Sequence, residues 1–116
     1  MLLDERQMLF FFRGIHVPLP FTTFKLLSLL ANKPKEIVTR KEMYQTLWPN
    51  AVISGSDGPY DHQITDHKHR IISQIKKATE GTKTVTQAEI KKLIVTKPRI
   101  GYMLNVDRGD VWVLGG

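Results

Sequence analysis

The sequence of 116 residues contains no cysteine. This absence excludes disulfide bonds and thiolate metal sites and suits a reducing compartment, so we expect a cytoplasmic protein. Long apolar runs are also missing. The run Met8–Phe12 near the start is far too short to cross a membrane, and Asp4 and Glu5 exclude a signal peptide. We therefore expect no membrane segment within this chain.

Acidic residues are scarce relative to basic ones. The chain has 17 Lys and Arg against 11 Asp and Glu, a net charge of +6, which favours an anionic partner. Most of the surplus lies between Tyr60 and Gly101, where nine Lys or Arg stand against four Asp or Glu and leave +5. A regional surplus is what a binding face requires. The length suits a single domain over residues 1–116.

The start of the chain predicts a small antiparallel sheet over about residues 6–19. Met8–Phe12 is rich in aromatic residues, and Arg13-Gly14 supplies a turn. The residues from Ile15 to Leu19 then alternate like a half-buried strand. Pro18 would confine that strand to a sheet edge because proline has no N–H to donate.

Two helices are predicted next. Apolar residues at helical spacing favour a helix over residues 21–31, which Asn32 and Pro34 would end. A second helix should begin after Thr39, because Glu42 three residues later completes a capping box. It should stop at Pro49, which cannot continue a helix.

A third helix is predicted from Tyr60 to Lys77. Ile64, Ile71 and Ile75 form one apolar stripe, and the aliphatic stem of Lys68 fills the gap between them. The opposite side of this helix carries polar and basic residues. It is the most basic helix in the chain.

The rest of the sequence predicts strands. One helical turn over Gln87–Lys92 leads into a hairpin of Leu93–Thr96 with Tyr102–Asn105, and a last strand is expected at Val111–Leu114. The whole is an α+β fold, with a three-helix core over about residues 21–77 and a hairpin over about 93–105. Three helices with such a hairpin form the winged helix-turn-helix plan.

Several segments resemble the DNA-binding domain of OmpR/PhoB-type bacterial transcriptional regulators, including the branch typified by CadC and ToxR. The likeness lies in Leu19–Leu27, in Val38–Met43 followed by Leu47-Trp48-Pro49, and in Thr96–Tyr102. Together with the third helix, these segments cover most of the chain from Arg6 to Leu104. Each segment alone would be a weak signal, and the combination of spacings is the specific one.

The resemblance implies a response-regulator-type domain that binds double-stranded DNA and regulates transcription. The helix Tyr60–Lys77 would be the recognition helix, with His67 and Arg70 facing DNA, and the loop 50–59 would contact RNA polymerase. The sequence departs from the pattern in having Pro20 where a Ser or Thr cap is common and Lys68 where an apolar residue is expected. Too few residues precede the first helix to form a receiver or sensor module within this sequence.

The predicted DNA contacts divide between the third helix and the hairpin. Arg70 is the first choice for a base, because a guanidinium can pair with guanine through two hydrogen bonds. Lys97 and Arg99 flank Pro98 at the hairpin tip, where cations suit a narrow minor groove or its phosphates. We expect Gly101 to serve the turn. The full predicted set is His67, Lys68, His69, Arg70, Ser73, Lys76, Lys77, Lys97 and Arg99.

Other functions remain open at this point. A winged helix can be a protein-interaction module whose basic face meets an acidic protein. His62, Asp66 and His69 share one helix face and could ligate a metal, although a second element would have to complete the site. We expect no metal or cofactor and no enzymatic activity, since no nucleophile elbow or phosphate-binding loop is present. One small domain buries limited surface, so specific binding favours two copies, as a homodimer on DNA.

Overall fold

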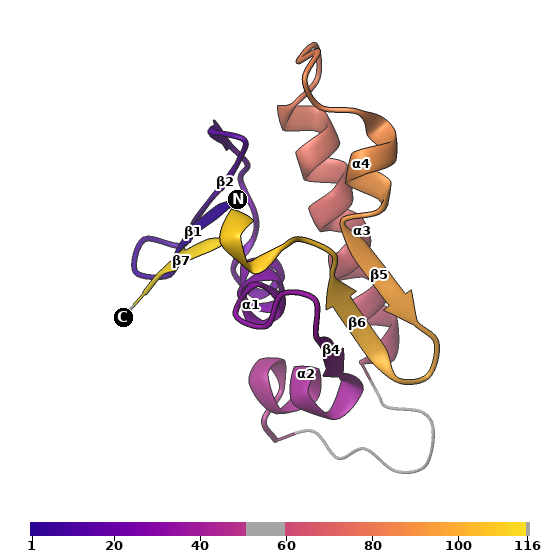
Figure 1. Ribbon diagram of the computed structural model, residues 1–116. Helices are drawn as coiled ribbons and strands as arrows, with labels where there is room; N and C mark the ends of the chain where they lie inside the picture. The colour runs from indigo at the N-terminus through magenta and orange to yellow at the C-terminus, as the bar shows by residue number, and fades with distance from the viewer. Residues whose placement is uncertain (51–59, 116) are drawn as a thin grey trace.

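The computed structural model describes residues 1–50 and 60–115 and shows two small sheets around a helical core (Figure 1). In chain order the elements are β1 (Leu2–Asp4), β2 (Leu9–Phe12), β3 (Ile15–His16), α1 (Phe21–Ala31), β4 (Ile37–Thr39), α2 (Arg40–Leu47), α3 (Asp61–Ala78), α4 (Gln87–Lys91), β5 (Ile94–Lys97), β6 (Gly101–Leu104), η1 (Arg108–Asp110) and β7 (Trp112–Leu114). The predicted α+β winged-helix plan is confirmed.

The N-terminal sheet has four strands in the order β3-β2-β1-β7. β1 runs antiparallel to β2, with Leu3 opposite Phe10, and parallel to β7, with Leu3 opposite Val113. The antiparallel sheet predicted over residues 6–19 is present as the β2–β3 pair, and the prediction omitted β1 and the parallel pairing with β7. A three-residue strand with one buried residue shows no readable alternation, and its parallel partner comes from the far end of the chain.

The second sheet joins the hairpin to the segment before α2. Its order is β4-β6-β5, with Val38 opposite Tyr102. The hairpin of β5 and β6 is confirmed within one residue of its predicted bounds. The sequence predicted only the start of the second helix at this point and no strand before it. Val38 is fully buried in β4, and this strand attaches the hairpin to the helices.

The helices follow their local signals closely. α1 has the predicted bounds, although Pro20 at its N-cap makes no side-chain hydrogen bond. α2 is capped as predicted, because the Glu42 backbone N–H donates to Thr39 Oγ1 at 3.2 Å. α4 begins in the same manner, with the Glu89 N–H donating to Thr86 Oγ1 at 3.1 Å.

The start of α3 is tied to α2 by a small polar cluster. The Tyr44 hydroxyl donates to Asp61 Oδ1 at 2.7 Å and accepts from the Tyr60 N–H at 2.7 Å. Arg40 Nη1 donates to Asp61 Oδ2 at 3.1 Å. Burial and the adjacent Asp61 carboxylate raise the pKa of Tyr44, so the hydroxyl stays protonated and available as a donor. These bonds fix where α3 begins.

The core lies between the three long helices and the inner faces of both sheets. α1 contributes Leu26, Leu27 and Leu30, and α3 contributes Ile71 and Ile75, all of them fully buried. Such burial removes apolar surface from water and is the main stabilising contribution for a chain of this size. In the part of the chain that the structure describes, no helix is both long and apolar enough to cross a membrane.

Gly101 is required by a close approach of two strands, and the expectation that it serves the turn was wrong. It lies in β6 opposite both Thr39 and Lys97. A Cβ at this position would stand 1.9 Å from the Val38 carbonyl oxygen and 2.8 Å from its carbon. Both are backbone atoms, so no side-chain rotation can make room. β4 can pair with β6 at this distance only because residue 101 has no side chain.

We predict that Gly101→Ala lowers the free energy of unfolding by about 2–3 kcal/mol, the upper part of the range for overpacked sites. Chemical denaturation followed by circular dichroism would measure it. Gly109→Ala is the matched control, because a Cβ there meets nothing within 4 Å. Equal stability of the two variants would contradict the assigned role of Gly101.

Candidate nucleic-acid interface

One face of α3 is exposed along the length of the helix. Arg70, Ser73 and Lys77 recur at three- and four-residue intervals, so they lie on the side opposite the buried Ile71 and Ile75. The predicted residues found on this face are His69, Arg70, Ser73 and Lys77, all exposed, with Lys76 half-buried at its margin. The other sides of α3 pack against α1 and α4.

The hairpin tip carries the second basic group. Pro98, Arg99 and Ile100 form a tight turn in which the Ile100 N–H donates to the Lys97 carbonyl at 3.0 Å. Arg99 has a φ of 66°, in the left-handed region that favours glycine. Pro98 followed by a residue of positive φ is the pattern of a type II turn, where glycine or asparagine usually stands. An exposed arginine therefore occupies a position that is unfavourable for its backbone.

α2 supports this tip from the other side. The Arg40 backbone N–H donates to the Ile100 carbonyl at 2.9 Å, immediately beyond the β4–β6 pairing. Between the tip and the start of α3 lies a cleft of about 290 Å³, whose wall includes Thr65, Lys97 and Arg99. The hairpin cations therefore border the same cleft as the first turns of α3.

Lys68 points toward the hairpin, away from the exposed face of α3. Its Nζ donates to Thr96 Oγ1 at 2.6 Å and lies 5.5 Å from the centre of the Tyr102 ring. One turn earlier, the Thr65 and Tyr102 hydroxyls share a hydrogen bond of 3.4 Å. These contacts explain why a lysine stands in the apolar stripe, since its stem packs while its ammonium binds the hairpin.

His67 lies on the opposite flank of α3, against α1 and α2. Its Nδ1 shares a hydrogen bond of 2.8 Å with Thr23 Oγ1, and its ring stacks on Trp48 with centroids 6.4 Å apart. Burial and the nearby Arg70 cation lower the pKa of His67, and Asp66 opposes this shift. Of the nine predicted residues, His67 and Lys68 are thus the two that face neighbouring elements.

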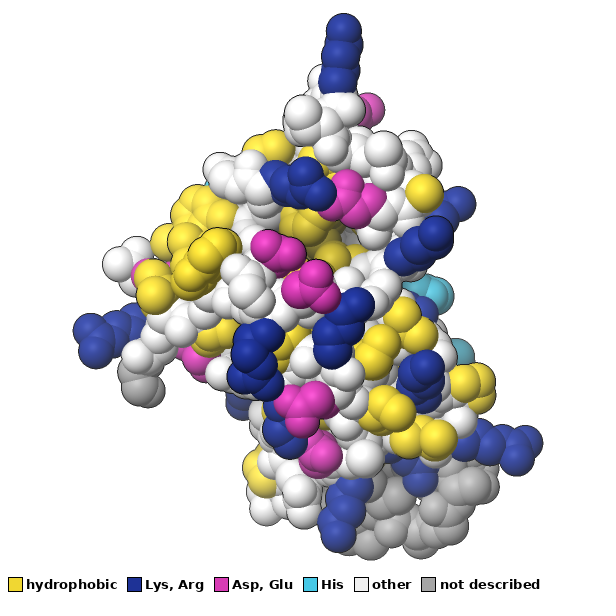
Figure 2. Space-filling view, in the orientation of Figure 1, with side chains coloured by type: hydrophobic (Ala, Val, Ile, Leu, Met, Phe, Trp, Pro, Cys, Tyr) yellow, Lys and Arg dark blue, Asp and Glu magenta, His cyan; other side chains and the backbone are white. Residues whose placement is uncertain are grey.

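Figure 2 shows how the charge is distributed on the side that presents α4 and the hairpin. Lys and Arg side chains project along the margins of the molecule, including the margin beside α3, where histidines also appear. Toward the middle of the same face, acidic side chains lie among the basic ones. The two signs are therefore interspersed on this face, and His side chains stand beside Lys and Arg at the margin near α3.

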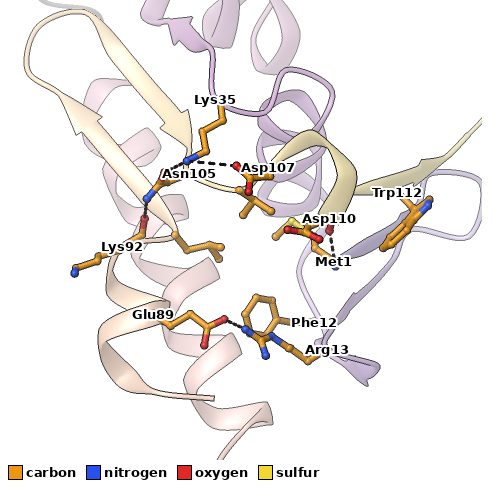
Figure 3. Close-up of a pocket in the computed structure, with 12 residues that line it drawn as sticks. Met1, Phe12, Arg13, Lys35, Glu89, Lys92, Asn105, Asp107, Asp110 and Trp112 are labelled. Atoms are coloured by element: carbon orange, nitrogen blue, oxygen red, sulfur yellow. Dashed lines mark hydrogen bonds and ion pairs between the residues drawn. The ribbon is translucent and has the colours of Figure 1, made fainter. Parts of the chain in front are cut away.

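A second cleft, of about 550 Å³, lies between the N-terminal sheet and α4 (Figure 3). Several of its polar side chains are engaged with one another. Arg13 forms an ion pair with Glu89, and Lys35 Nζ donates to Asn105 Oδ1 at 2.6 Å and lies 3.9 Å from Asp107. The cleft is therefore the junction at which the N-terminal sheet is held to α4 and to the base of the hairpin.

Two further expectations concern a metal site on α3 and the loop that precedes this helix. Within residues 1–50 and 60–115, no three His, Cys, Asp or Glu side chains are placed to hold a metal ion, so His62, Asp66 and His69 form no such site. The loop 50–59, predicted to contact RNA polymerase, lies outside the described residues except for Asn50. Sequence reasoning missed the supporting role of Arg40, which no motif in the chain signals.

The fold matches known structures although the sequence does not. No protein-family model matches the chain, and no curated protein matches it in sequence. The DNA-binding domain of E. coli CadC is similar with a TM-score of 0.54 and 20% identity, over 85% of this chain and 79% of that one. The DNA-binding domain of the response regulator AdeR, in complex with an intercistronic region, has a TM-score of 0.58 and 17% identity, over 90% and 92%. Both are OmpR/PhoB-type winged helices, so the predicted resemblance is confirmed for the fold.

We predict that His67 makes the fold sensitive to acid. Because its pKa is lowered in the folded state, the unfolded chain binds the proton more readily. His67 therefore contributes stability that is present above its unfolded pKa of about 6.5 and is lost as the pH falls through the lower folded value. Denaturation curves between about pH 7.5 and pH 5 should show a smaller loss of stability in His67→Gln than in the wild type.

His62→Gln is the matched control, because it removes an exposed imidazole from the same helix and leaves the Thr23 contact intact. This variant shows whether the effect is specific to the imidazole that contacts Thr23. The assignment to His67 is contradicted if His67→Gln and the wild type lose stability in parallel.

Proposed function

We propose that this chain binds double-stranded DNA in a sequence-specific manner and regulates transcription, as a domain of the OmpR/PhoB type in the bacterial cytoplasm. The observation that carries the proposal is the exposed basic face of α3 beside a basic hairpin tip, which the Arg40 N–H holds through the Ile100 carbonyl. This arrangement occurs on a fold shared with two DNA-binding domains, one of them in complex with DNA. A helix that lies in the major groove and a hairpin that reaches the adjacent groove would use both features.

The residues of the α3 face divide by chemistry. Arg70 is the base-reading residue in this proposal, because its side chain is exposed at the middle of the helix and can bind guanine through two hydrogen bonds. His69 and Ser73 would contact neighbouring bases or phosphates. Lys76 and Lys77, in the last turn of the helix, would neutralise phosphates and release counterions.

His67 and Lys68 contribute differently in this proposal. Each is held by side chains outside α3, Thr23 in one case and Thr96 in the other. We assign them the positioning of α3 against α1 and of the hairpin against α3. A direct DNA contact by either residue stays a prediction. The Lys68→Met variant described below tests it for Lys68.

The backbone of Arg99 supports a functional role for the hairpin tip. A non-glycine residue in the left-handed region costs about 1–2 kcal/mol. Such a cost persists where the side chain supplies something that glycine would not. A guanidinium beside Lys97 supplies cationic charge for a narrow minor groove or its flanking phosphates.

Two further partners belong to the proposal. The segment 50–59 would contact RNA polymerase, by the resemblance alone. A second copy of the chain would bind an adjacent half-site, because one domain of this size covers few base pairs.

The competing function is a protein-interaction module with an acidic partner. It predicts that removing cations from α3 leaves affinity for duplex DNA unchanged. DNA binding is favoured because the cations occur on both α3 and the hairpin tip, at the two positions that a winged helix presents to adjacent grooves.

We predict that Arg70→Ala weakens binding to a duplex selected from randomised oligonucleotides by about 10- to 100-fold, as expected for loss of one bidentate base contact. Binding to an unrelated duplex should weaken less. Fluorescence anisotropy at several salt concentrations would measure both affinities. Arg6→Ala, an exposed arginine in the N-terminal turn, removes the same charge and should leave both nearly unchanged.

Lys68→Met refines this experiment, because methionine keeps the packed stem and removes the ammonium. The slope of log affinity against log salt should stay as in the wild type if Lys68 only positions the hairpin. A slope reduced by about one would show that Lys68 neutralises a phosphate.

Unchanged affinity of Arg70→Ala for every duplex would overturn the DNA-binding proposal.

We predict that Arg99→Gly separates binding from stability. Glycine relieves the backbone at φ 66°, so the free energy of unfolding should stay constant or rise by up to about 1 kcal/mol. Affinity for DNA should fall by about fivefold to tenfold, because one cation is lost from the tip. Denaturation and anisotropy on the same sample would measure the two effects. A variant that binds DNA like the wild type would remove Arg99 from the interface.

A further inference from the structure

β7 leaves one edge of the N-terminal sheet open. In the strand order β3-β2-β1-β7 it has β1 on one side, and no described strand covers its other side. An open strand edge offers backbone N–H and C=O groups to a further strand. Neither α3 nor the hairpin explains this edge, because Figure 1 places β7 on the far side of α1 from both.

The hydrogen bonds to β1 show which groups of β7 point outward. The Trp112 N–H donates to the Met1 carbonyl at 2.9 Å, and the Leu114 carbonyl accepts from the Glu5 N–H at 2.6 Å. Trp112 and Leu114 therefore direct their backbone groups toward β1. Because these directions alternate along a strand, the N–H and C=O of Val113 point to the open edge.

The side chains of β7 alternate in the same way. Trp112 is 58% exposed and Leu114 53% exposed, and both lie on the outer face of the sheet. Val113, between them, packs against the core. The apolar surface continues inward from Trp112, since Leu2 of β1 stands opposite it and Phe11 of β2 stands opposite Leu2. Exposed large apolar residues on an open edge indicate an association surface.

We propose that a second copy of this chain covers the edge, with the two β7 strands antiparallel about a two-fold axis at Val113. The two Val113 residues then exchange N–H···O=C bonds as a hydrogen-bonded pair. Trp112 of each copy stands opposite Leu114 of the other in a non-hydrogen-bonded pair, the closer of the two pair types. The strand is thus complementary to itself in both backbone and side chains.

The structure favours this two-fold pairing over a head-to-tail pairing within the N-terminal sheet. Such a head-to-tail contact would join β7 to the other edge of that sheet, which is β3. That strand has two residues, Ile15 and His16, and Pro18 and Pro20 follow it closely. Proline cannot donate to a neighbouring strand, so the β3 edge accepts little pairing. Of the two edges of the N-terminal sheet, β7 is therefore the better partner for β7.

Three paired residues bury far less area than a stable dimer needs, so the association is weak in free solution. It leaves the α3 face and the hairpin tip of both copies uncovered, because they lie on the other side of the molecule. Two copies brought together on one duplex would pair at a high effective concentration. The two-fold axis then requires half-sites arranged as an inverted repeat.

Sedimentation equilibrium of the chain without DNA tests the pairing independently of the proposed function. Between about 10 µM and about 1 mM, the wild type should show a reversible monomer–dimer equilibrium. The double variant Trp112→Lys with Leu114→Lys places like charges in the pairing register and should weaken the dimer by at least about tenfold. The control is Phe21→Lys with Ile37→Lys, which changes two exposed apolar residues elsewhere and should dimerise like the wild type.

Disulfide trapping tests the register without lysine substitutions, because the chain contains no native cysteine. Trp112→Cys mixed with Leu114→Cys should give a cross-linked heterodimer faster than either variant gives a homodimer. A wild type that stays monomeric throughout the range would overturn the proposal. A dimer that persists unchanged in the double variant Trp112→Lys with Leu114→Lys would also overturn it. Equal cross-linking rates in the mixed and single cysteine samples would do the same.

Discussion

The pairing of β4 with β6 is the constraint on which the arrangement of the candidate interface depends. β4 leads directly into α2, and β6 is one strand of the hairpin, so their contact sets the hairpin against the helices. The contact is possible because Gly101 leaves room for the Val38 carbonyl. The Arg40 N–H, the first of α2, then binds the Ile100 carbonyl, which transmits the position of α2 to the turn. Backbone atoms therefore set the position of the tip that carries Arg99 relative to α2.

The elements that could be predicted from the sequence are those whose signals are local. α1 and α2 were predicted almost to the residue, because a capping box, a proline and helical spacing all lie within the segments themselves. β1 and β4 each bury one residue. β4 depends on a partner distant in sequence, Tyr102, and β1 joins the nearby β2 to the distant Val113. Such strands become visible only when the partner is known, because three residues carry no period.

In the candidate site too, features with local signals could be predicted, and features that depend on distant neighbours could not. Helical periodicity alone places Arg70, Ser73 and Lys77 on the exposed side of α3. It does not say what lies on the flanks of the helix, since α1 and the hairpin supply those neighbours. Lys68 consequently read as a DNA contact from its charge, whereas its ammonium binds the hairpin. The strain at Arg99 was equally out of reach, because φ follows from the turn and the turn from the strand register.

The contacts that attach the hairpin and the charge at its tip have different physical origins. This separation has a consequence for the specificity of the proposed DNA binding. The tip is held by strand pairing and by Lys68 and Tyr102, while Arg99 occupies its position at a conformational cost. The charge at the tip can therefore change without weakening the contacts that hold the hairpin. On α3, by contrast, Arg70 lies next to His67, whose contacts hold the helix to α1. In the proposed function, changes in base recognition on α3 would act beside the packing that orients this helix. The hairpin tip is therefore the part of the proposed interface that can vary most freely.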